Sequence, residues 1–331
     1  MNKFPLVSIV IPTFNNQSQL VFCLQSIRQQ TYPVDKIEVI IADGGSTDST
    51  IKIAKQFECV IIKNKKRLAE YGVALGLKIA KGDYVTIMAA DNELGTSNYI
   101  KQIIIPFVED KNIFIAYPKH TNSPQDNWIT RYINTFTDPV NHFVYADAAN
   151  TRTFHKIYQV EYSSKDYIVY KFSTIDYPLI ALAQGTTLRK DFQRKVFTHG
   201  DDISPIIEMI EEGYKLAYVP GAQILHHTIS STTSFIKKQQ WAIDNILFKK
   251  KYGIQTRTHF FSKERYLRKV LWPVYAASII LPLIQTIRGL IMERQKEWIY
   301  HSILTYITVV ILILEIFRVK ILGKKEHKDR K

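Results

Sequence analysis

The chain has 331 residues and a mass of 38.4 kDa, enough for about two domains of ordinary size. With 46% hydrophobic and 22% charged residues it is not a disordered chain, and 13 Gly and 12 Pro exclude a collagen-like one. Its two cysteines exclude a disulfide framework and a cysteine-rich zinc module, and we expect no signal peptide because Pro5 and Pro12 bracket too short an apolar run.

The net charge of +14 is unevenly distributed along the chain. Residues 256–331 hold 15 Lys and Arg against 6 Asp and Glu, whereas residues 1–255 hold 29 against 24. The excess therefore lies beside the most apolar segments, which is typical of a membrane-facing end. We expect no nucleic-acid partner, because the basic end lacks interleaved aromatic residues and any base-reading motif.

Strand and helix signals alternate over residues 1–115. Apolar, β-branched runs at residues 6–11, 37–42, 60–62 and 84–89 predict strands, and apolar residues at helical spacing predict helices over residues 16–30, 48–57 and 68–80. This order predicts an α/β fold with a largely parallel sheet covered by helices on both faces. Ligands bind such sheets at the carboxyl ends of the strands, so the polar residues there are the first candidates.

Later segments give weaker signals. Residues 120–175 are rich in Tyr, Phe, Asn and Asp and permit no firm assignment, and we interpret most of their aromatic side chains as core. Residues 203–212 and 233–251 predict helices, and residues 214–219 predict a strand.

Two apolar stretches follow, at residues 270–287 and 298–314. As helices they would reach roughly 25–27 Å, close to the ~30 Å of a bilayer core. Pro273 and Pro282 interrupt the first stretch. A hairpin through the membrane, a pair of helices in one leaflet and two buried helices of a soluble domain all fit this pattern. Flanking basic clusters place both ends on the cytoplasmic side.

Four motifs occur in a recognisable order: VSIVIPTFN at residues 7–15, IIADGGSTDST at 40–50, AKGDY at 80–84 and GYKLAYVP at 213–220. In order and spacing they resemble the signatures of family 2 glycosyltransferases over residues 5–250. The resemblance implies a GT-A fold, which is a Rossmann-like sheet flanked by helices. It also implies transfer of a sugar from a nucleotide donor to an acceptor hydroxyl, with inversion at the anomeric carbon.

The donor-binding residues that we expect follow the first two strands. Asp43 ends a buried strand, where its oxygens can accept hydrogen bonds from a base N–H or a ribose O–H. Asp48 is interpreted as a cap of the following helix. Lys63, Lys65, Lys66 and Arg67 are a solvated basic run, or else supply one contact to a phosphate. By resemblance, the donor pocket also comprises Pro12, Thr13, Asn15, Gly44, Ser46 and Asp91.

The family's metal motif is Asp-X-Asp, and here the corresponding residues are Ala89, Ala90 and Asp91. The first aspartate is therefore missing, and Asp91 occupies the metal-binding position. The resemblance implies that Asp91 and His226 hold Mg²⁺ or Mn²⁺ together with the donor diphosphate, with His227 taking this role if the register slips by one. The ordinary alternatives are a structural Asp91 and a histidine satisfied by packing.

Inverting transfer needs a general base for the acceptor hydroxyl. The family places an acidic pair before a helix for this purpose, and Asp201 and Asp202 match that position, with Asp202 aligned to the base. An aspartate before Ile-Ser-Pro is also a good helix N-cap, so one residue of the pair can cap while the other is catalytic.

These observations predict a GT-A catalytic domain over residues 1–255 and a membrane-associated helical segment with a basic tail over 256–331. The expected function is transfer from a UDP-sugar to a lipid-linked glycan or a surface polysaccharide at the cytoplasmic face of the membrane. One alternative is a polyprenyl-phosphate sugar synthase, whose acceptor needs no base. Another is a catalytically weak scaffold that binds sugar nucleotides, which the absence of the first aspartate would explain.

Overall fold

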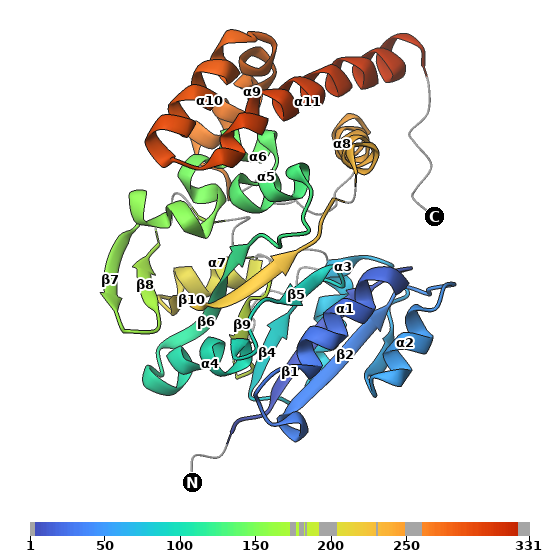
Figure 1. Cartoon of the computed structure of the whole chain (residues 1–331), viewed down its shortest axis with the longest axis vertical. Helices are drawn as coiled ribbons and strands as arrows, with labels where there is room; N and C mark the ends of the chain where they lie inside the picture. The colour runs from blue at the N-terminus through green and yellow to red at the C-terminus, as the bar shows by residue number, and fades with distance from the viewer. Residues whose placement is uncertain are drawn as a thin grey trace. The chain divides into compact units, whose positions relative to one another are not determined.

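The computed structural model describes residues 4–172, 177–178, 182, 184–191, 204–229, 231–248 and 260–323. Contacts between residues divide the chain into two units, which Figure 1 draws. The first, here called the sheet unit, comprises Met1–Thr121 and Thr151–His226. The second, the helical unit, comprises Asn122–Asn150 and His227–Lys331. The expected boundary between residues 255 and 256 lies outside the described residues and stays a prediction.

The first half of the sheet unit follows the predicted alternation of strands and helices. Strand β1 lies between β2 and β4, and β3 pairs with the other side of β2, all in parallel. The α/β class is confirmed here, and each element lies within a few residues of its predicted range. The elements are β1 (Val7–Thr13), α1 (Gln17–Arg28), β2 (Ile37–Asp43), α2 (Thr50–Gln56), β3 (Val60–Lys63), α3 (Ala69–Ile79) and β4 (Tyr84–Ile87).

The second half of the sheet is mixed, which differs from the largely parallel sheet that the sequence predicts. Among the described strands the order is β3-β2-β1-β4-β9-β6-β10-β8-β7, with β5 also pairing with β10. Strand β10 runs parallel to β6, while β9 runs antiparallel to both β4 and β6. The elements are β5 (Asn92–Leu94), α4 (Tyr99–Glu109), β6 (Ile113–Thr121), β7 (Gln159–Ser163), β8 (Ile168–Lys171), β9 (Thr187–Arg189), α7 (Ser204–Glu211) and β10 (Lys215–His226).

The two faces of β1 pack against different helices. Ile9 and Ile11 belong to a buried cluster with Leu24 of α1 and Ile103 of α4. Val10, which points to the opposite face, packs with residues at the end of α3. Helix α3 approaches β1 so closely that a Cβ on Gly76 would lie 2.3 Å from Cγ1 of Val10. The period-2 pattern of the strand thus explains its burial on both sides.

The helical unit contains α5 (Trp128–Phe136), α6 (Pro139–Tyr145), α8 (Thr232–Leu247), α9 (Lys263–Ala277), α10 (Ile280–Glu293) and α11 (His301–Ile316). Helices α5 and α6 were not predicted, although both begin at well-formed caps. The Asn127 side chain accepts from the backbone N–H groups of Ile129 and Thr130, and Asp138 caps α6 ahead of Pro139. These Asn and Asp-Pro signals were present in a segment whose hydrophobic pattern is not periodic.

The two apolar stretches differ in structure. Residues 296–321 form the described helix that is long and apolar enough to cross a membrane, counting its flanking turns. The first stretch is broken instead: α9 and α10 meet at an angle of 100°. The break lies at Ser278 and Ile279, where Ile279 has a φ of 61°, and neither Pro273 nor Pro282 is at the break itself. Within the described residues the first apolar stretch is therefore a bent pair of helices, and the second is a continuous helix.

The buried Ser8 and the half-buried Glu38 join β1, β2 and the turn before β4. Ser8 is fully buried, and its Oγ donates to Oε2 of Glu38 at 2.6 Å and accepts from the N–H of Gly82 at 2.9 Å. The same Glu38 oxygen accepts from the N–H of Lys81 at 2.9 Å. The turn that starts the third family motif is thus held by the first strand.

We expect Ser8→Ala to lower the free energy of unfolding by about 1–3 kcal/mol, because the Gly82 N–H loses its buried partner. Ser18→Ala is the matched control, since the Ser18 hydroxyl is exposed and bonds only to the neighbouring Gln19 side chain among the described residues. Denaturant or thermal unfolding of both variants measures the difference. Equal stability of the two variants would contradict this assignment.

Candidate active site

The carboxyl ends of the first three strands lie at one edge of the sheet, as predicted. In the parallel register Thr13 is opposite Asp43, and Asp43 is opposite Lys63. The Asn64 backbone N–H donates to the Asp43 carbonyl at 2.7 Å, which continues the pairing past the last strand residue. Strand register thus brings together Thr13 and Asp43, two of the expected donor residues.

The Asp43 carboxylate shapes the turn that follows it. It accepts hydrogen bonds from the N–H of Gly45 at 2.8 Å and of Ser46 at 3.0 Å, and from the Ser46 hydroxyl at 2.5 Å. Gly45 has a φ of 89°, which favours glycine. The side chain is 7% exposed. Asp43 is thus fixed in one orientation at the sheet edge.

A second set of bonds joins the loop after β1 to this turn. The Asn15 N–H donates to the Ser46 hydroxyl at 2.9 Å, and the Asn15 side-chain oxygen accepts from the Thr47 N–H at 2.8 Å. The Gly44 N–H donates to the Thr13 carbonyl at 2.8 Å, and a Cβ on Gly44 would lie 3.3 Å from that oxygen. Asn15, Gly44 and Ser46 therefore build one double loop.

Pro12 and Thr13 are placed differently. A Cβ on Gly72 would lie 2.9 Å from Cβ of Pro12, so this ring packs toward α3. The Thr13 hydroxyl is buried and has no hydrogen-bond partner among the described residues. A buried hydroxyl without a partner costs free energy of folding. A polar ligand bound at this edge of the sheet would supply the missing hydrogen-bond partner.

Asp48 helps to start α2, although Ser49 is the residue at the N-cap position. Its carboxylate accepts from the N–H of Thr50 at 3.0 Å and from that of Gln17 at 3.1 Å. Burial raises the pKa of Asp48, but hydrogen bonds from Thr50 and Gln17 outweigh it, so the pKa is lowered overall. Asp48 therefore joins the starts of two helices.

The basic run contributes one cation to this edge. The Arg67 guanidinium lies over the Phe14 ring, 5.0 Å from its centroid, and Arg67 has a φ of 55°. A Cβ on Gly45 would lie 3.8 Å from an Arg67 nitrogen. A positive charge thus lies beside the turn that the Asp43 carboxylate shapes.

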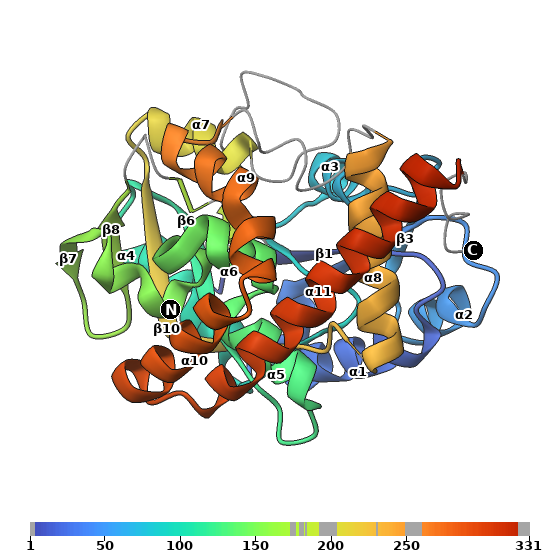
Figure 2. The same ribbon diagram turned by 90° about the horizontal axis from the view of Figure 1, so that it is seen from above.

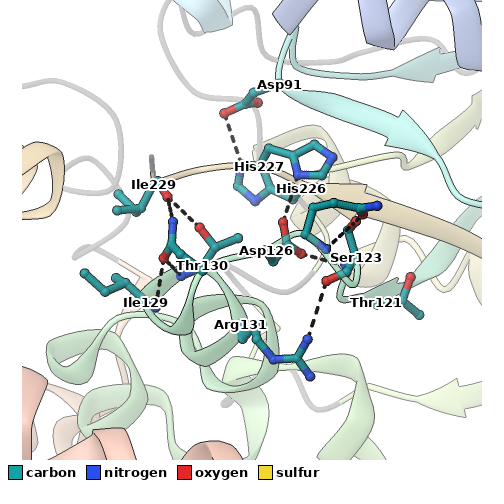
Figure 3. Close-up of polar contacts among 12 residues, drawn as sticks. Asp91, Thr121, Ser123, Asp126, Ile129, Thr130, Arg131, His226, His227 and Ile229 are labelled. Carbon is teal, nitrogen blue, oxygen red and sulfur yellow. Dashed lines mark hydrogen bonds and ion pairs between the residues drawn. The ribbon is translucent and has the colours of Figure 1, made fainter. Parts of the chain in front are cut away.

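The predicted metal residues Asp91 and His226 face each other (Figure 3). Nε2 of His226 lies 3.5 Å from Oδ2 of Asp91. The pairing of β5 with β10 brings them together, because Asn92 is directly opposite His226 in that antiparallel register. His227 belongs instead to the helical unit, where its Nδ1 lies 2.8 Å from Oδ1 of Asp126.

Three neighbours of this pair were not predicted. Asn92 is fully buried, accepts from the Ala89 N–H at 2.9 Å and donates to Oε1 of Gln184 at 2.6 Å. Nε2 of Gln184 lies 3.3 Å from Nε2 of His226. Burial and the nearby His226 lower the pKa of His120 to about 4, so this imidazole is neutral at neutral pH. Asn92 could have been noticed, since it directly follows Asp91.

The Asp91–His226 pair fits a divalent cation that takes its remaining ligands from elsewhere. A carboxylate oxygen and an imidazole nitrogen are ordinary ligands for Mn²⁺, and Mg²⁺ keeps several non-protein ligands. Among the described residues no group of three or more His, Cys, Asp or Glu side chains gathers around one point. A cation here would therefore depend on phosphate oxygens and water.

The predicted acidic pair, Asp201 and Asp202, lies outside the described residues. The helix expected after it is present as α7, which begins at Ser204. The capping and catalytic roles of the two carboxylates both stay predictions.

We expect Asn92→Ala to lower the free energy of unfolding by about 1–3 kcal/mol, because both the Ala89 N–H and the Gln184 side chain lose a buried partner. Asn98→Ala is the control: Asn98 is exposed, and its side chain makes no capping bond to α4. Thermal unfolding of the two variants is the measurement. A control that is destabilised as much as Asn92→Ala would refute the assignment.

Comparisons with known proteins agree with this architecture. The chain is 25% identical over 343 aligned positions to the Methanococcus voltae dolichyl N-acetyl-alpha-D-glucosaminyl phosphate 3-beta-D-2,3-diacetamido-2,3-dideoxy-beta-D-glucuronosyltransferase, covering 97% of this chain and 99% of the relative. It is 31% identical over 102 residues to the poly(ribitol-phosphate) beta-glucosyltransferase of Bacillus spizizenii, covering 29% of this chain and 16% of that protein.

A solved structure shares the fold over most of the chain. The mannosyltransferase PcManGT from Pyrobaculum calidifontis, in complex with GDP-Man and Mn²⁺, superposes with a TM-score of 0.51 at 14% identity, over 96% of this chain and 88% of that one. The sequence model of the family described as glycosyl transferase family 2 matches residues 8–172, which include β1 to β4 and the Asp43 and Asp91 sites. The chain belongs to glycosyl transferase family 2, and it is a glycosyltransferase with a GT-A fold.

Proposed function

We propose that the protein transfers a sugar from a UDP-sugar to a hydroxyl of a lipid-linked glycan or surface polysaccharide, at the cytoplasmic face of the membrane. The observation that carries this proposal is that the sheet unit places two polar groups of side chains at the ends of its strands. A fixed carboxylate, Asp43, ends β2. Asp91, after β4, forms a carboxylate–imidazole pair with His226, the last residue of β10. One suits the nucleoside of the donor and the other suits its diphosphate.

The nucleoside would bind beside the double loop. Asp43 Oδ2 already accepts from the N–H groups of Gly45 and Ser46, whereas Oδ1 accepts the Ser46 hydroxyl and a long 3.3 Å bond from the Ser46 N–H. Oδ1 is therefore the oxygen that would accept from the nucleoside, in place of that long bond. Thr13 and Asn15 offer a hydroxyl and an amide nitrogen at the same edge. Arg67 adds a positive charge near the turn, where it would attract the negatively charged diphosphate of the donor.

The diphosphate would lie toward Asp91 and His226. These side chains would hold Mg²⁺ or Mn²⁺, which neutralises the charge that develops on the departing diphosphate. Asn92 and Gln184 orient the pair, because Gln184 bridges the buried Asn92 amide and the His226 ring. The name of the solved P. calidifontis complex includes GDP-Man and Mn²⁺, which supports the same class of donor.

The acceptor hydroxyl would attack the anomeric carbon while Asp202 takes its proton. The new C–O bond forms on one face of the sugar as the bond to the diphosphate breaks on the other, so the configuration inverts. The proposed acceptor class is supported by the names of the M. voltae and B. spizizenii relatives, which refer to a dolichyl-linked sugar phosphate and to a poly(ribitol-phosphate).

Donor binding is tested by calorimetric titration of UDP, with and without Mn²⁺, against the detergent-purified chain. We expect metal-dependent binding that Asp43→Ala and Asp91→Ala each weaken at least tenfold. Asp35→Ala, an exposed carboxylate of the same unit, should leave it unchanged. GDP and deoxythymidine diphosphate serve as comparison nucleotides.

Metal-independent UDP binding would remove Asp91 as a ligand. Failure to bind any of these nucleotides, in a chain that still unfolds cooperatively, would overturn the donor assignment and favour a role without catalysis.

Asp202→Asn tests the base. A general base typically contributes about 10²–10⁴-fold to the rate, so we expect kcat to fall by that factor while UDP affinity stays at the wild-type value. Single-turnover assays with a radiolabelled donor measure this. Full activity of Asp202→Asn would instead indicate an anionic acceptor that needs no base.

A further inference from the structure

The outer faces of helices α9, α10 and α11 are apolar. Ile303, Val310 and Ile313 of α11 recur at helical spacing and share one face, which Phe317 continues directly after the helix. Aliphatic side chains on the three helices have 52–70% of their surface exposed, among them Val270, Val274, Ile284, Ile291, Val310 and Ile313. An exposed apolar surface of this extent marks contact with a partner or a membrane.

The inner face of α11 buries polar side chains beside Leu304, Val309 and Ile311, which departs from the usual pattern of a surface helix. His301, Thr305, Thr308 and Glu315 are all buried. The two ring nitrogens of His301 lie 2.6 Å and 2.9 Å from the hydroxyls of Tyr132 and Tyr275, in α5 and α9. The polar side of α11 therefore serves packing inside the helical unit, and its apolar side faces outward.

Helix α11 is fastened to α8, and the two lie side by side (Figures 1 and 2). An Arg318 nitrogen lies 2.6 Å from Oδ1 of Asp244, and Nε2 of Gln240 donates to Oε1 of Glu315 at 3.0 Å. Asp244 and Glu315 are each 3% exposed. Separating the two helices would break a buried ion pair between Asp244 and Arg318, so we expect them to move together.

Helix α8 cannot enter a bilayer core with its partner. Its surface carries Lys237 and Lys238, both exposed, and ionised side chains are costly in hydrocarbon. Helices α9 and α10 have 15 and 14 residues and meet at 100°. Each is only about 21–22 Å long, short of the ~30 Å bilayer core. The three apolar faces therefore suit burial at shallow depth.

The charges of this region also suit a membrane surface. Residues 260–323 hold 9 Lys and Arg against 4 Asp and Glu. Two of the four carboxylates, Glu297 and Glu315, are buried. Cationic residues such as Lys263, Lys296 and Lys320 lie exposed at or beyond the helix ends. The exposed charge is thus mainly positive, complementary to an anionic leaflet.

We infer that α9, α10 and α11 lie in the plane of one leaflet of an anionic bilayer and do not cross it, with α8 holding α11 at the surface. This inference rests on the proposed membrane-facing function, and it decides between the hairpin and the one-leaflet arrangement that the sequence leaves open. The whole chain then stays on one side of the membrane.

The test is thiol labelling of the full chain in sealed inside-out vesicles of the expression host. The background is Cys59→Ser, with the fully buried Cys23 retained. Single variants Lys263→Cys, Lys296→Cys and Lys320→Cys are treated with a membrane-impermeant maleimide, and Ser18→Cys reports the exposed side. We expect all three to react from outside to the same extent as Ser18→Cys.

Protection of Lys296→Cys until detergent is added, while Lys320→Cys reacts, would show that α11 crosses the bilayer and would overturn the inference. Absence of the chain from washed vesicles would overturn it as well. Thiol labelling does not depend on sugar transfer, so a chain that binds no nucleotide can still give the expected labelling. Failure of the proposed function is therefore distinguishable from failure of this inference.

A second measurement covers the apolar face itself. The double variant Val274→Asn, Ile291→Asn should co-sediment with vesicles of phosphatidylglycerol and phosphatidylcholine about tenfold more weakly than wild type. Val160→Asn, an exposed valine of the sheet unit, is the control and should bind as wild type. Thermal unfolding checks that each variant is folded. Equal binding of all forms would contradict the inference.

Discussion

Parallel pairing of β1 with β2 is the constraint on which the candidate site depends. It sets Thr13 opposite Asp43, so that the loops after both strands begin at the same level. Only then can the Asn15 N–H reach the Ser46 hydroxyl and the Gly44 N–H reach the Thr13 carbonyl. A register shift of one residue would turn the Asp43 side chain to the other face of the sheet.

The sequence predicted this half of the site because its signals are local. β-Branched runs ending in Pro-Thr or Asp-Gly-Gly specify strand and turn within about ten residues, and the order of strands follows from the α/β pattern. The contact of Gln184 with Asn92 spans 92 residues of sequence, and no periodicity points to it. The three-residue strand β9 was likewise too short to be seen, although it runs between β4 and β6.

The helical unit shows the complementary difficulty. Hydropathy alone made residues 270–287 and 298–314 equivalent, whereas one is bent at Ser278 and the other is continuous. Hydropathy also does not show which side chains bond to each polar residue of these helices. His301 bonds to two tyrosines and Glu315 to Gln240 and Arg318, so the polar residues of α11 are explained by packing. The exposed apolar side chains of α11 are the ones that we infer to contact lipid.

Asp91 and His226 come from segments that meet through one short strand. Strand β5 has three residues, and its pairing with β10 is what sets the carboxylate opposite the imidazole. A ligand held by both side chains binds only the molecules in which this pairing is intact, so its binding free energy adds to the stability of β5 against local opening. Ligand binding would therefore slow amide hydrogen exchange at Glu93 and Leu94, although neither residue needs to contact the ligand.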